Sequence, residues 1–261
     1  MTELCECFGY SRQALYKYKL QDDQKERAMI LKKVQTIRYN QPHVGTRKLK
    51  DHLAGQGITV GRDRLFDLLR ARQLLIKPKR RYQKTTYSRH RLKTYRNLVK
   101  DHPATGPDQV YASDITYVST DQGYQYLFLI TDMYSRKIVG HCLHKDLTIS
   151  GALMALQRAI KQQRKPREFI HHSDRGIQYC SHEYIRMLEH HNASVSMTEE
   201  NHVYENALAE RVNGILKTEL LPRRLPRATA HKIVERAINI YNKQRLHNSL
   251  INRTPESVHN N

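Results

Sequence analysis

The stretch QVYASDITYVS, residues 109–119, alternates apolar with polar side chains and is rich in β-branched and aromatic residues, which predicts a β-strand. Two further strands are predicted directly after it, YQYLFLITD at residues 124–132 and RKIVGHCLH at residues 136–144. Strand and helix patterns then alternate, with strands expected at 168–173 and 194–197 and helices at 149–163, 181–191, 204–220 and 228–245. Three consecutive strands followed by alternating helices and strands predict one mixed α/β domain.

The residues before this domain are predicted to be helical. Helical patterns are expected at residues 4–8, 11–18, 23–40, 46–54 and 62–75. Gly9 would form a turn between the first two helices, and Ser11 and Thr46 are predicted N-caps. Paired short helices of this kind are typical of helix-turn-helix units, which place one helix in the major groove of DNA, but any small helical bundle gives the same pattern.

Basic residues are concentrated in the N-terminal part of the chain. The 261 residues include 45 Lys+Arg and 25 Asp+Glu, a formal net charge of +20. Residues 1–100 hold 25 Lys+Arg against 8 Asp+Glu (net +17), and residues 101–261 hold 20 against 17 (net +3). Segregated charge of this size favours a polyanion as the partner, because each phosphate contact releases condensed counterions. The alternative is a basic surface that only keeps the protein in solution.

Residues 77–100 are the most basic segment, with ten Lys/Arg, no acidic residue, and Tyr82, Tyr87 and Tyr95 between them. Such a segment can follow DNA phosphates and stack on bases, although a flexible tether without a specific role has the same composition. We predict DNA contacts from five of its basic residues, Arg80, Arg81, Lys84, Arg89 and Arg91.

Several protein classes are excluded by what the sequence lacks. No apolar stretch approaches the roughly 18 to 20 residues of a membrane span, and the first residues do not resemble a signal peptide. Four cysteines in a chain of this length do not make a disulfide framework, so a cytoplasmic protein is expected. The cysteines and the pairs His171-His172 and His190-His191 lack zinc-site spacing and are expected to be structural or surface residues. No Walker-type phosphate loop occurs, which argues against ATP use.

Three acidic residues occupy positions that suggest a metal site. Asp114 lies inside the first predicted strand, Asp174 follows a later strand in HHSDRGIQY, and Glu210 lies in the helical stretch NALAERVNG. An acidic residue within an apolar strand needs a stabilising partner, and a metal ion is the obvious one. Taken singly, Asp174 also suits an ordinary turn and Glu210 a solvated helix. The intervals between the three are 59 and 35 residues.

These residues and their neighbours resemble the integrase-core transposases of bacterial insertion sequences, specifically the second-frame product of the insertion sequence 3 group. The motifs that carry the resemblance are Asp114–Tyr117 (DITY), His172–Gly176 (HSDRG), Asn206–Glu210 (NALAE), Leu216–Glu219 (LKTE), Tyr241-Asn242 with Arg245–Leu250 (RLHNSL), and Thr254-Pro255. The resemblance extends from about residue 40 to residue 258. It departs from the family at Tyr111, where Trp is usual, and at Glu205, where Asp is common; neither change touches the three acidic residues.

The resemblance implies an RNase H-like core, a mixed five-stranded sheet flanked by helices, preceded by an all-α helix-turn-helix region and a basic linker. The expected boundaries are a DNA-binding region at 1–76, the linker at 77–104 and the catalytic core with its C-terminal helix at 105–261. Asp114, Asp174 and Glu210 would be the catalytic residues and the ligands of Mg²⁺, for which Mn²⁺ would substitute. Two ions about 3.5–4 Å apart stabilise both the attacking and the leaving oxygen in phosphodiester transfer.

The implied activity is that of a DNA transposase: cleavage at the ends of the element, followed by attack of the freed 3′-hydroxyl on a second phosphodiester. The alternatives are a transposase-derived repressor that only binds DNA and a nuclease that only hydrolyses it. Expected partners are double-stranded DNA carrying the terminal inverted repeats, target DNA, at least one more copy of the chain, and an upstream first-frame protein or a frameshifted fusion with it. The expected location is the bacterial cytoplasm, at the nucleoid.

Helix geometry adds two residues to the predicted DNA contacts. Lys217 follows Glu210 by seven positions, two turns of an α-helix, and Asn213 lies on the same face. We therefore expect both side chains to point towards DNA beside the triad formed by Asp114, Asp174 and Glu210. For Lys217 the alternative is a solvated lysine paired with a nearby acidic residue.

Overall fold

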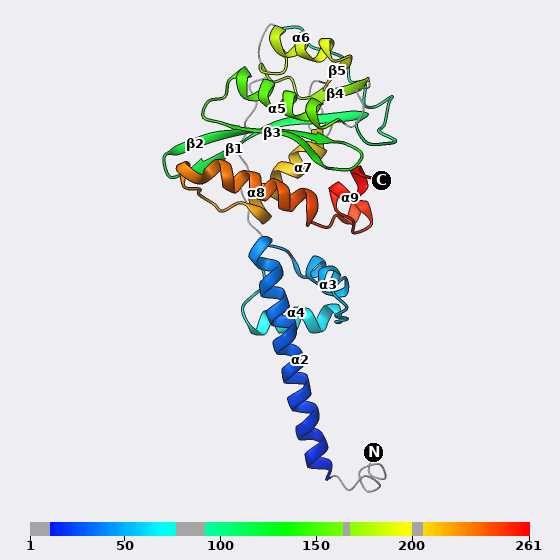
Figure 1. Ribbon diagram of the computed structural model, residues 1–261, viewed down its shortest axis with the longest axis vertical. Coiled ribbons are helices and arrows are strands. Elements are labelled where there is room, and N and C mark those ends of the chain that lie inside the picture. The colour runs from blue at the N-terminus through cyan, green and yellow to red at the C-terminus, as the bar shows by residue number, and fades with distance from the viewer. Residues whose placement is uncertain (1–10, 77–91, 164–167, 200–205) are drawn as a thin grey trace. The chain divides into compact units, whose positions relative to one another are not determined.

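The structure is a computed structural model that describes residues 11–76, 92–163, 168–199 and 206–261 (Figure 1). The chain divides into two compact units, residues 1–78 and 79–261. The first unit has one hydrophobic core, and the second has one on each face of its sheet. Within the described ranges, every helix is too short or too polar to cross a membrane.

The described part of the first unit is formed by three helices, α2 (Arg12–Asn40), α3 (Thr46–Ala54) and α4 (Arg62–Ala71). The C-terminal half of α2 packs on α3 and α4 through apolar side chains that include Val34, Leu49 and Leu65. The sequence pattern predicted two helices where α2 is one, because neither Gly nor Pro interrupts the chain between residues 12 and 40.

Of two local predictions for the first unit, one is wrong and the other lies outside the described residues. Thr46 was predicted to be an N-cap, but it is the first residue of α3, and Gly45 occupies the N-cap position. The helix predicted at residues 4–8 and the turn at Gly9 lie outside the described residues.

The second unit is built on a mixed five-stranded sheet with the strand order β3-β2-β1-β4-β5. Its strands are β1 (Val110–Thr120), β2 (Gly123–Asp132), β3 (Ile138–His144), β4 (Phe169–Ser173) and β5 (Ala193–Met197). β1, β2 and β3 form antiparallel pairs, whereas β4 pairs with β1, and β5 with β4, in parallel. The predicted mixed five-stranded sheet is confirmed.

Helices cover both faces of this sheet. They are α5 (Ile149–Gln162), α6 (His182–His190), α7 (Ala207–Ile215), α8 (Ala230–Lys243) and α9 (Pro255–His259). Helices α5 and α6 pack on one face, and α7 and α8 on the other (Figure 1). α5 approaches β3 closely at Gly140, where a Cβ atom would lie 2.3 Å from the carbonyl oxygen of Ala155.

Short helical turns complete the second unit. They are the π-helical turn η2 (Leu216–Leu220) and the 3₁₀ turns η3 (Arg227–Thr229) and η4 (Asn248–Leu250). The helix predicted to continue to residue 220 therefore ends as α7 at Ile215, and in η2 the Leu221 N–H donates to the Leu216 carbonyl at 2.8 Å. Because a π-turn holds more residues than an α-turn, the two-turn α-helical phase expected between Glu210 and Lys217 is not kept.

Candidate active site

Asp114 and Asp174 are brought together by the register of two parallel strands. β1 and β4 pair residue for residue up to Ala112, which stands opposite His172. Asp114 lies two residues further along β1, and Asp174 lies two residues after His172, directly after β4 ends. The parallel pairing thus ends two residues before each acidic residue, and the two are close enough for the Asp174 charge to act on Asp114.

The turn after β4 holds the Asp174 carboxylate in place. Asp174 Oδ1 accepts a hydrogen bond from the Gly176 N–H at 3.0 Å. A Cβ atom at Gly176 would lie 3.0 Å from that same oxygen, so glycine leaves room for the carboxylate. The Arg175 side chain is committed elsewhere, since its Nε donates to the Thr198 carbonyl at 2.8 Å. The Ser-Asp-Arg-Gly turn is therefore built around the carboxylate.

Two asparagines attach α7 to β1 on either side of Glu210. Asn206 Nδ2 donates to the Ser113 carbonyl at 3.1 Å, and Asn213 Nδ2 donates to Asp114 Oδ2 at 2.6 Å. Residues four before and three after Glu210 share its helix face, so the Glu210 carboxylate is directed to the Asp114 side of α7. The sequence motifs indicated no role for Asn206. Its position four residues before Glu210, about one helical turn, is the signal that could have placed it on the same side of α7 as Glu210.

Burial and mutual repulsion raise the pKa of two of these carboxyl groups. Burial first, and then the Asp174 charge, raise the pKa of Asp114 to about 7, and the Glu210 charge adds to the effect. The Ile115 N–H and Asn213 oppose that rise by hydrogen bonding to the Asp114 carboxylate. Burial and the Asp174 charge also raise the pKa of Glu210. Three like charges thus act on one another here, which favours a bound cation.

The donor set at this position fits Mg²⁺. Carboxylate oxygens are the hard ligands that this ion prefers. In addition, the buried Oδ1 of Asn213 has no hydrogen-bond partner within the described part of the chain. An unsatisfied buried oxygen beside mutually repelling carboxylates is a feature that a cation and its bound water would relieve.

Lys217 contacts β1, the strand that carries Asp114. Its Nζ lies 4.0 Å from the centre of the Tyr117 ring, and the charge of Asp114 acts on it. Asn213 is only 6% exposed, and its Nδ2 donates a hydrogen bond to Asp114. The DNA contacts of Asn213 and Lys217 remain predictions. The other predicted DNA contacts lie outside the described residues: Arg80, Arg81, Lys84, Arg89 and Arg91.

The histidines of the HHSD motif belong to the core of the second unit. His171 Nε2 lies 2.6 Å from Ser113 Oγ and 2.9 Å from the Tyr184 hydroxyl oxygen. Burial lowers the pKa of His171 to about 3, which keeps the ring neutral. His172 Nδ1 lies 2.9 Å from Ser196 Oγ of β5. These two histidines therefore connect neighbouring strands beneath the triad.

A second polar cluster, formed by Asp108, Asp132 and His259, was not predicted. Their ligand atoms lie within 4.8 Å of one another, and all three residues are buried. Asp132 already accepts hydrogen bonds from the Asp108 and Ser135 N–H groups, and Asp108 accepts one from the Tyr111 hydroxyl. His259 Nδ1 lies 3.1 Å from Ser135 Oγ, so the cluster is a structural network that attaches α9 to the end of β2. No sequence signal indicates it, because His259 is 127 positions from Asp132.

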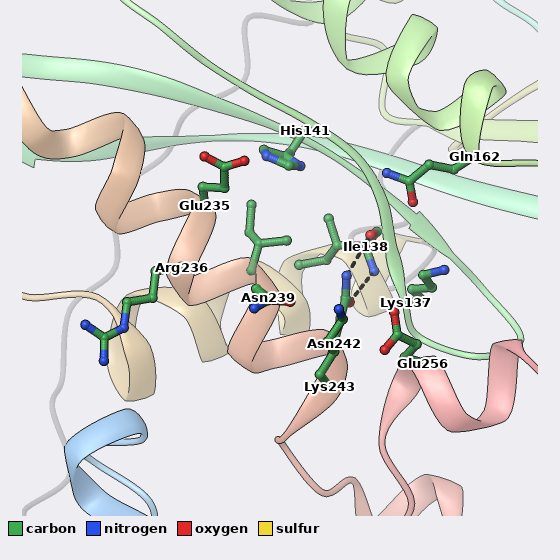
Figure 2. Close-up of a pocket in the computed structure, with 11 residues that line it drawn as sticks. Lys137, Ile138, His141, Gln162, Glu235, Arg236, Asn239, Asn242, Lys243 and Glu256 are labelled. Atoms are coloured by element: carbon green, nitrogen blue, oxygen red, sulfur yellow. Dashed lines mark hydrogen bonds between the residues drawn. The ribbon is translucent and has the colours of Figure 1, made fainter.

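A pocket of 440 Å³ lies between β3, α8 and the first turn of α9 (Figure 2). Charged side chains line it, among them Lys137, Glu235 and Glu256, together with His141. Its lining, as far as the described residues show it, contains none of the three carboxylates of the candidate triad. The pocket is therefore separate from the candidate active site.

Comparison with known proteins identifies the family. Two models, each described as an integrase core domain, match residues 104–202 and 191–255. The 31 kDa protein of insertion element IS600 from Shigella sonnei is 39% identical, covering 97% of this chain and 96% of the relative. Transposase InsF of insertion sequence IS3A from Escherichia coli K12 is 34% identical, covering 83% of this chain and 76% of the relative. The chain belongs to the IS3 family of transposases.

The fold of this transposase is also found in a solved retroviral intasome. The intasome of simian T-cell lymphotropic virus, solved with PP2A regulatory subunit B56 gamma, matches with a TM-score of 0.52 at 20% identity, over 84% of this chain and 72% of that one. The HTLV-2 integrase catalytic core domain, solved with magnesium, matches with a TM-score of 0.48 at 20% identity, over 59% of this chain and 98% of that one. The prediction of an integrase-core transposase that acts in DNA transposition is confirmed.

Proposed function

We propose that Asp114, Asp174 and Glu210 are the catalytic residues of this transposase and that together they hold two Mg²⁺ ions, for which Mn²⁺ substitutes. The observation that carries the proposal is the register of β1 and β4, whose parallel pairing ends two residues before Asp114 and two residues before Asp174. The repulsion among the three carboxylates supports it. When bound, the ions stabilise the charge that develops on the attacking and leaving oxygens.

The reaction is proposed to be cleavage at the element ends followed by strand transfer. In the first step, water attacks the phosphorus, the P–O3′ bond breaks, and a free 3′-hydroxyl and a 5′-phosphate remain. In the second step, that hydroxyl attacks a target phosphodiester and displaces the target's own 3′-hydroxyl. Each strand transfer exchanges one phosphodiester for another, so no ATP is required. No covalent enzyme intermediate is needed.

The protein scaffold contributes by holding the carboxylates rigidly. Asn213 fixes Asp114, the Gly176 N–H fixes Asp174, and Asn206 fixes the start of α7 against β1. Preorganised ligands of this kind lower the reorganisation that must accompany the reaction.

DNA binding is proposed for the residues before the core. We assign residues 1–76 to recognition of the terminal inverted repeats, 77–104 to a phosphate-binding linker and 105–261 to catalysis. In support, α3 and α4 pack as a pair whose outward side exposes basic residues such as Arg62 and Arg70. The substrate is double-stranded DNA of the element ends and target. Joining two ends requires at least a dimer, acting at the bacterial nucleoid.

A joining assay tests this proposal directly. Labelled duplexes carrying the element ends are incubated with the full chain and target DNA, in Mg²⁺, in Mn²⁺ and in EDTA. The wild type is compared with Asp114→Asn and Glu210→Gln. Asp146→Asn and Glu235→Gln serve as matched controls, because both carboxylates are exposed and lie outside the candidate site.

Metal-dependent joining by the wild type and both controls, but not by the two triad variants, supports the proposal. Release of labelled ends without joining would instead indicate the nuclease. Binding without cleavage by every variant would indicate the repressor. Joining by Asp114→Asn at the wild-type rate would overturn the assignment of the triad.

A further inference from the structure

The ammonium group of Lys217 is held by an aromatic ring instead of by a carboxylate. Its Nζ lies over the Tyr117 ring, 4.0 Å from the ring centre. Lys217 is half-buried, and within the described residues it forms no salt bridge. Burial lowers the pKa of this ammonium, against the opposing effect of the Asp114 charge. A half-buried cation without a paired anion is unfavourable unless the π-face of the ring compensates.

Neighbouring contacts hold both members of this pair in place. The Tyr124 ring, from the next strand, meets the Tyr117 ring edge-on with centroids 5.4 Å apart. On the other side, Glu219 is bound by both arms of the buried Arg245 guanidinium, with N–O distances of 2.8 Å. That bidentate pair fixes the π-helical turn η2 and occupies the acidic group two residues from Lys217. Because Arg245 binds Glu219, this carboxylate does not form an ion pair with Lys217.

A ring holds an ammonium differently from a carboxylate. An ion pair would neutralise the cation and would have to break before a phosphate could bind. The negative face of a tyrosine ring orients the cation but leaves its N–H donors available to an anion. Because the charge of Asp114 acts on Lys217, the ammonium held by the Tyr117 ring lies close to the candidate triad.

From this geometry we infer that Tyr117 is a positioning residue, which holds Lys217 ready to bind a backbone phosphate of the DNA strand next to the bond that is cleaved. The inference rests on the proposed function, because it takes the triad to be the site of cleavage. It assigns to the DITY motif a second role besides supplying Asp114.

A double-mutant cycle tests the inference by DNA binding in EDTA, where no cleavage takes place. Dissociation constants of the full chain for an element-end duplex are measured over a range of salt concentrations for the wild type, Tyr117→Leu, Lys217→Met and the double variant. Tyr117→Phe keeps the ring. Tyr134→Leu, in the turn between β2 and β3, is the matched control.

We expect Tyr117→Leu to weaken binding about 3- to 30-fold, the range of a partly desolvated cation–π contact. Lys217→Met is expected to reduce the salt dependence by about one phosphate contact. In the Lys217→Met background Tyr117→Leu should add almost nothing, while Tyr117→Phe and Tyr134→Leu stay near wild type. Equal losses from Tyr117→Leu in both backgrounds would mean that Tyr117 only supports the fold, and would overturn the inference.

A second series keeps the test valid where the leucine variant does not fold. Progressively fluorinated phenylalanines at position 117 keep the shape of the ring but remove its negative face. Binding should weaken with each added fluorine in the wild-type background and not in Lys217→Met. Unchanged binding across the series would reject the inference. Because none of these measurements involves cleavage, the inference can fail while the joining assay still supports the triad.

Discussion

Asn242 of α8 pairs with both main-chain groups of Ile138, the first residue of β3. The Ile138 N–H donates to Asn242 Oδ1, and Asn242 Nδ2 donates to the Ile138 carbonyl, each at 2.9 Å (Figure 2). β3 is an edge strand, and an edge strand presents unpaired N–H and C=O groups. The Asn242 amide therefore takes the place of a neighbouring strand at one residue and attaches α8 to the sheet. The C-terminal Tyr-Asn motif thus has a structural role.

Replacing this amide should destabilise the second unit. Asn242→Ala leaves the buried N–H and C=O of Ile138 without partners, at about 1–3 kcal/mol for each group. We expect a fall of about 2–4 kcal/mol in the free energy of unfolding, measured by urea denaturation. Asn239→Ala is the control, because Asn239 lies three residues earlier on α8 with its side chain exposed. Similar losses in both variants would contradict the role of Asn242.

Asp174→Asn should separate catalysis from DNA binding. The amide Oδ1 can still accept from the Gly176 N–H, so the turn is retained while the charge is lost. We expect joining to fall below detection and the DNA dissociation constant to stay the same or decrease, because a negative charge that faces phosphate is removed. Joining and filter-binding assays on the same preparation provide the comparison. Parallel losses of both would make Asp174 a structural residue.

Gly176→Ala tests whether the turn positions the carboxylate. The new Cβ atom would lie 3.0 Å from Asp174 Oδ1, so the carboxylate must move. We expect the joining rate to fall at least tenfold, about 1.4 kcal/mol in the barrier, with little change in melting temperature. Gly55→Ala is the control, since its nearest atoms would be at 3.6 Å, an ordinary contact. A wild-type rate in Gly176→Ala would show that the turn tolerates the added atom.

The raised pKa of Asp114 predicts how stability depends on pH when no metal is bound. Its folded pKa is about 7 against an ordinary value of 3.8, so between these pH values the folded state holds a proton that the unfolded chain releases. Stability therefore falls as pH rises through this window. Without metal at pH 8, Asp114→Asn should be more stable than the wild type by at least about 1 kcal/mol, or 2–4 °C in melting temperature.

The same comparison contains its own controls. The advantage of Asp114→Asn should shrink as pH is lowered from 7 to below 3.8, where the wild-type carboxyl group becomes protonated in the unfolded state as well as in the folded state. At pH 8, Mg²⁺ should raise the melting temperature of the wild type more than that of the variant, because a ligand stabilises the state that binds it. A stability difference that does not change with pH would show that the Asp114 charge is not repelled in the folded protein.

Local patterns predicted the elements well where burial alternates along the chain. The predicted strand at 109–119 became β1 (Val110–Thr120), whose residues from Ile115 to Thr120 alternate between half-buried and buried. Its first four residues are all buried, because helices cover both faces of the sheet. Contacts distant in sequence decided the exceptions. The turn η2 departs from the predicted α-helix where Glu219 meets Arg245, 26 residues later, and a pattern confined to one helix carries no sign of that pair.

The order of strands and helices and the choice of three acidic residues as the predicted site follow from the sequence by itself, because alternation, helix spacing and motif residues are local properties. Only the tertiary structure decided the register of β1 and β4 that brings Asp114 near Asp174, the asparagines that fix α7, and the ring beneath Lys217. Each of these joins residues that lie far apart in the chain. Their alignment depends on how the helices pack on both faces of the sheet, which no local pattern specifies.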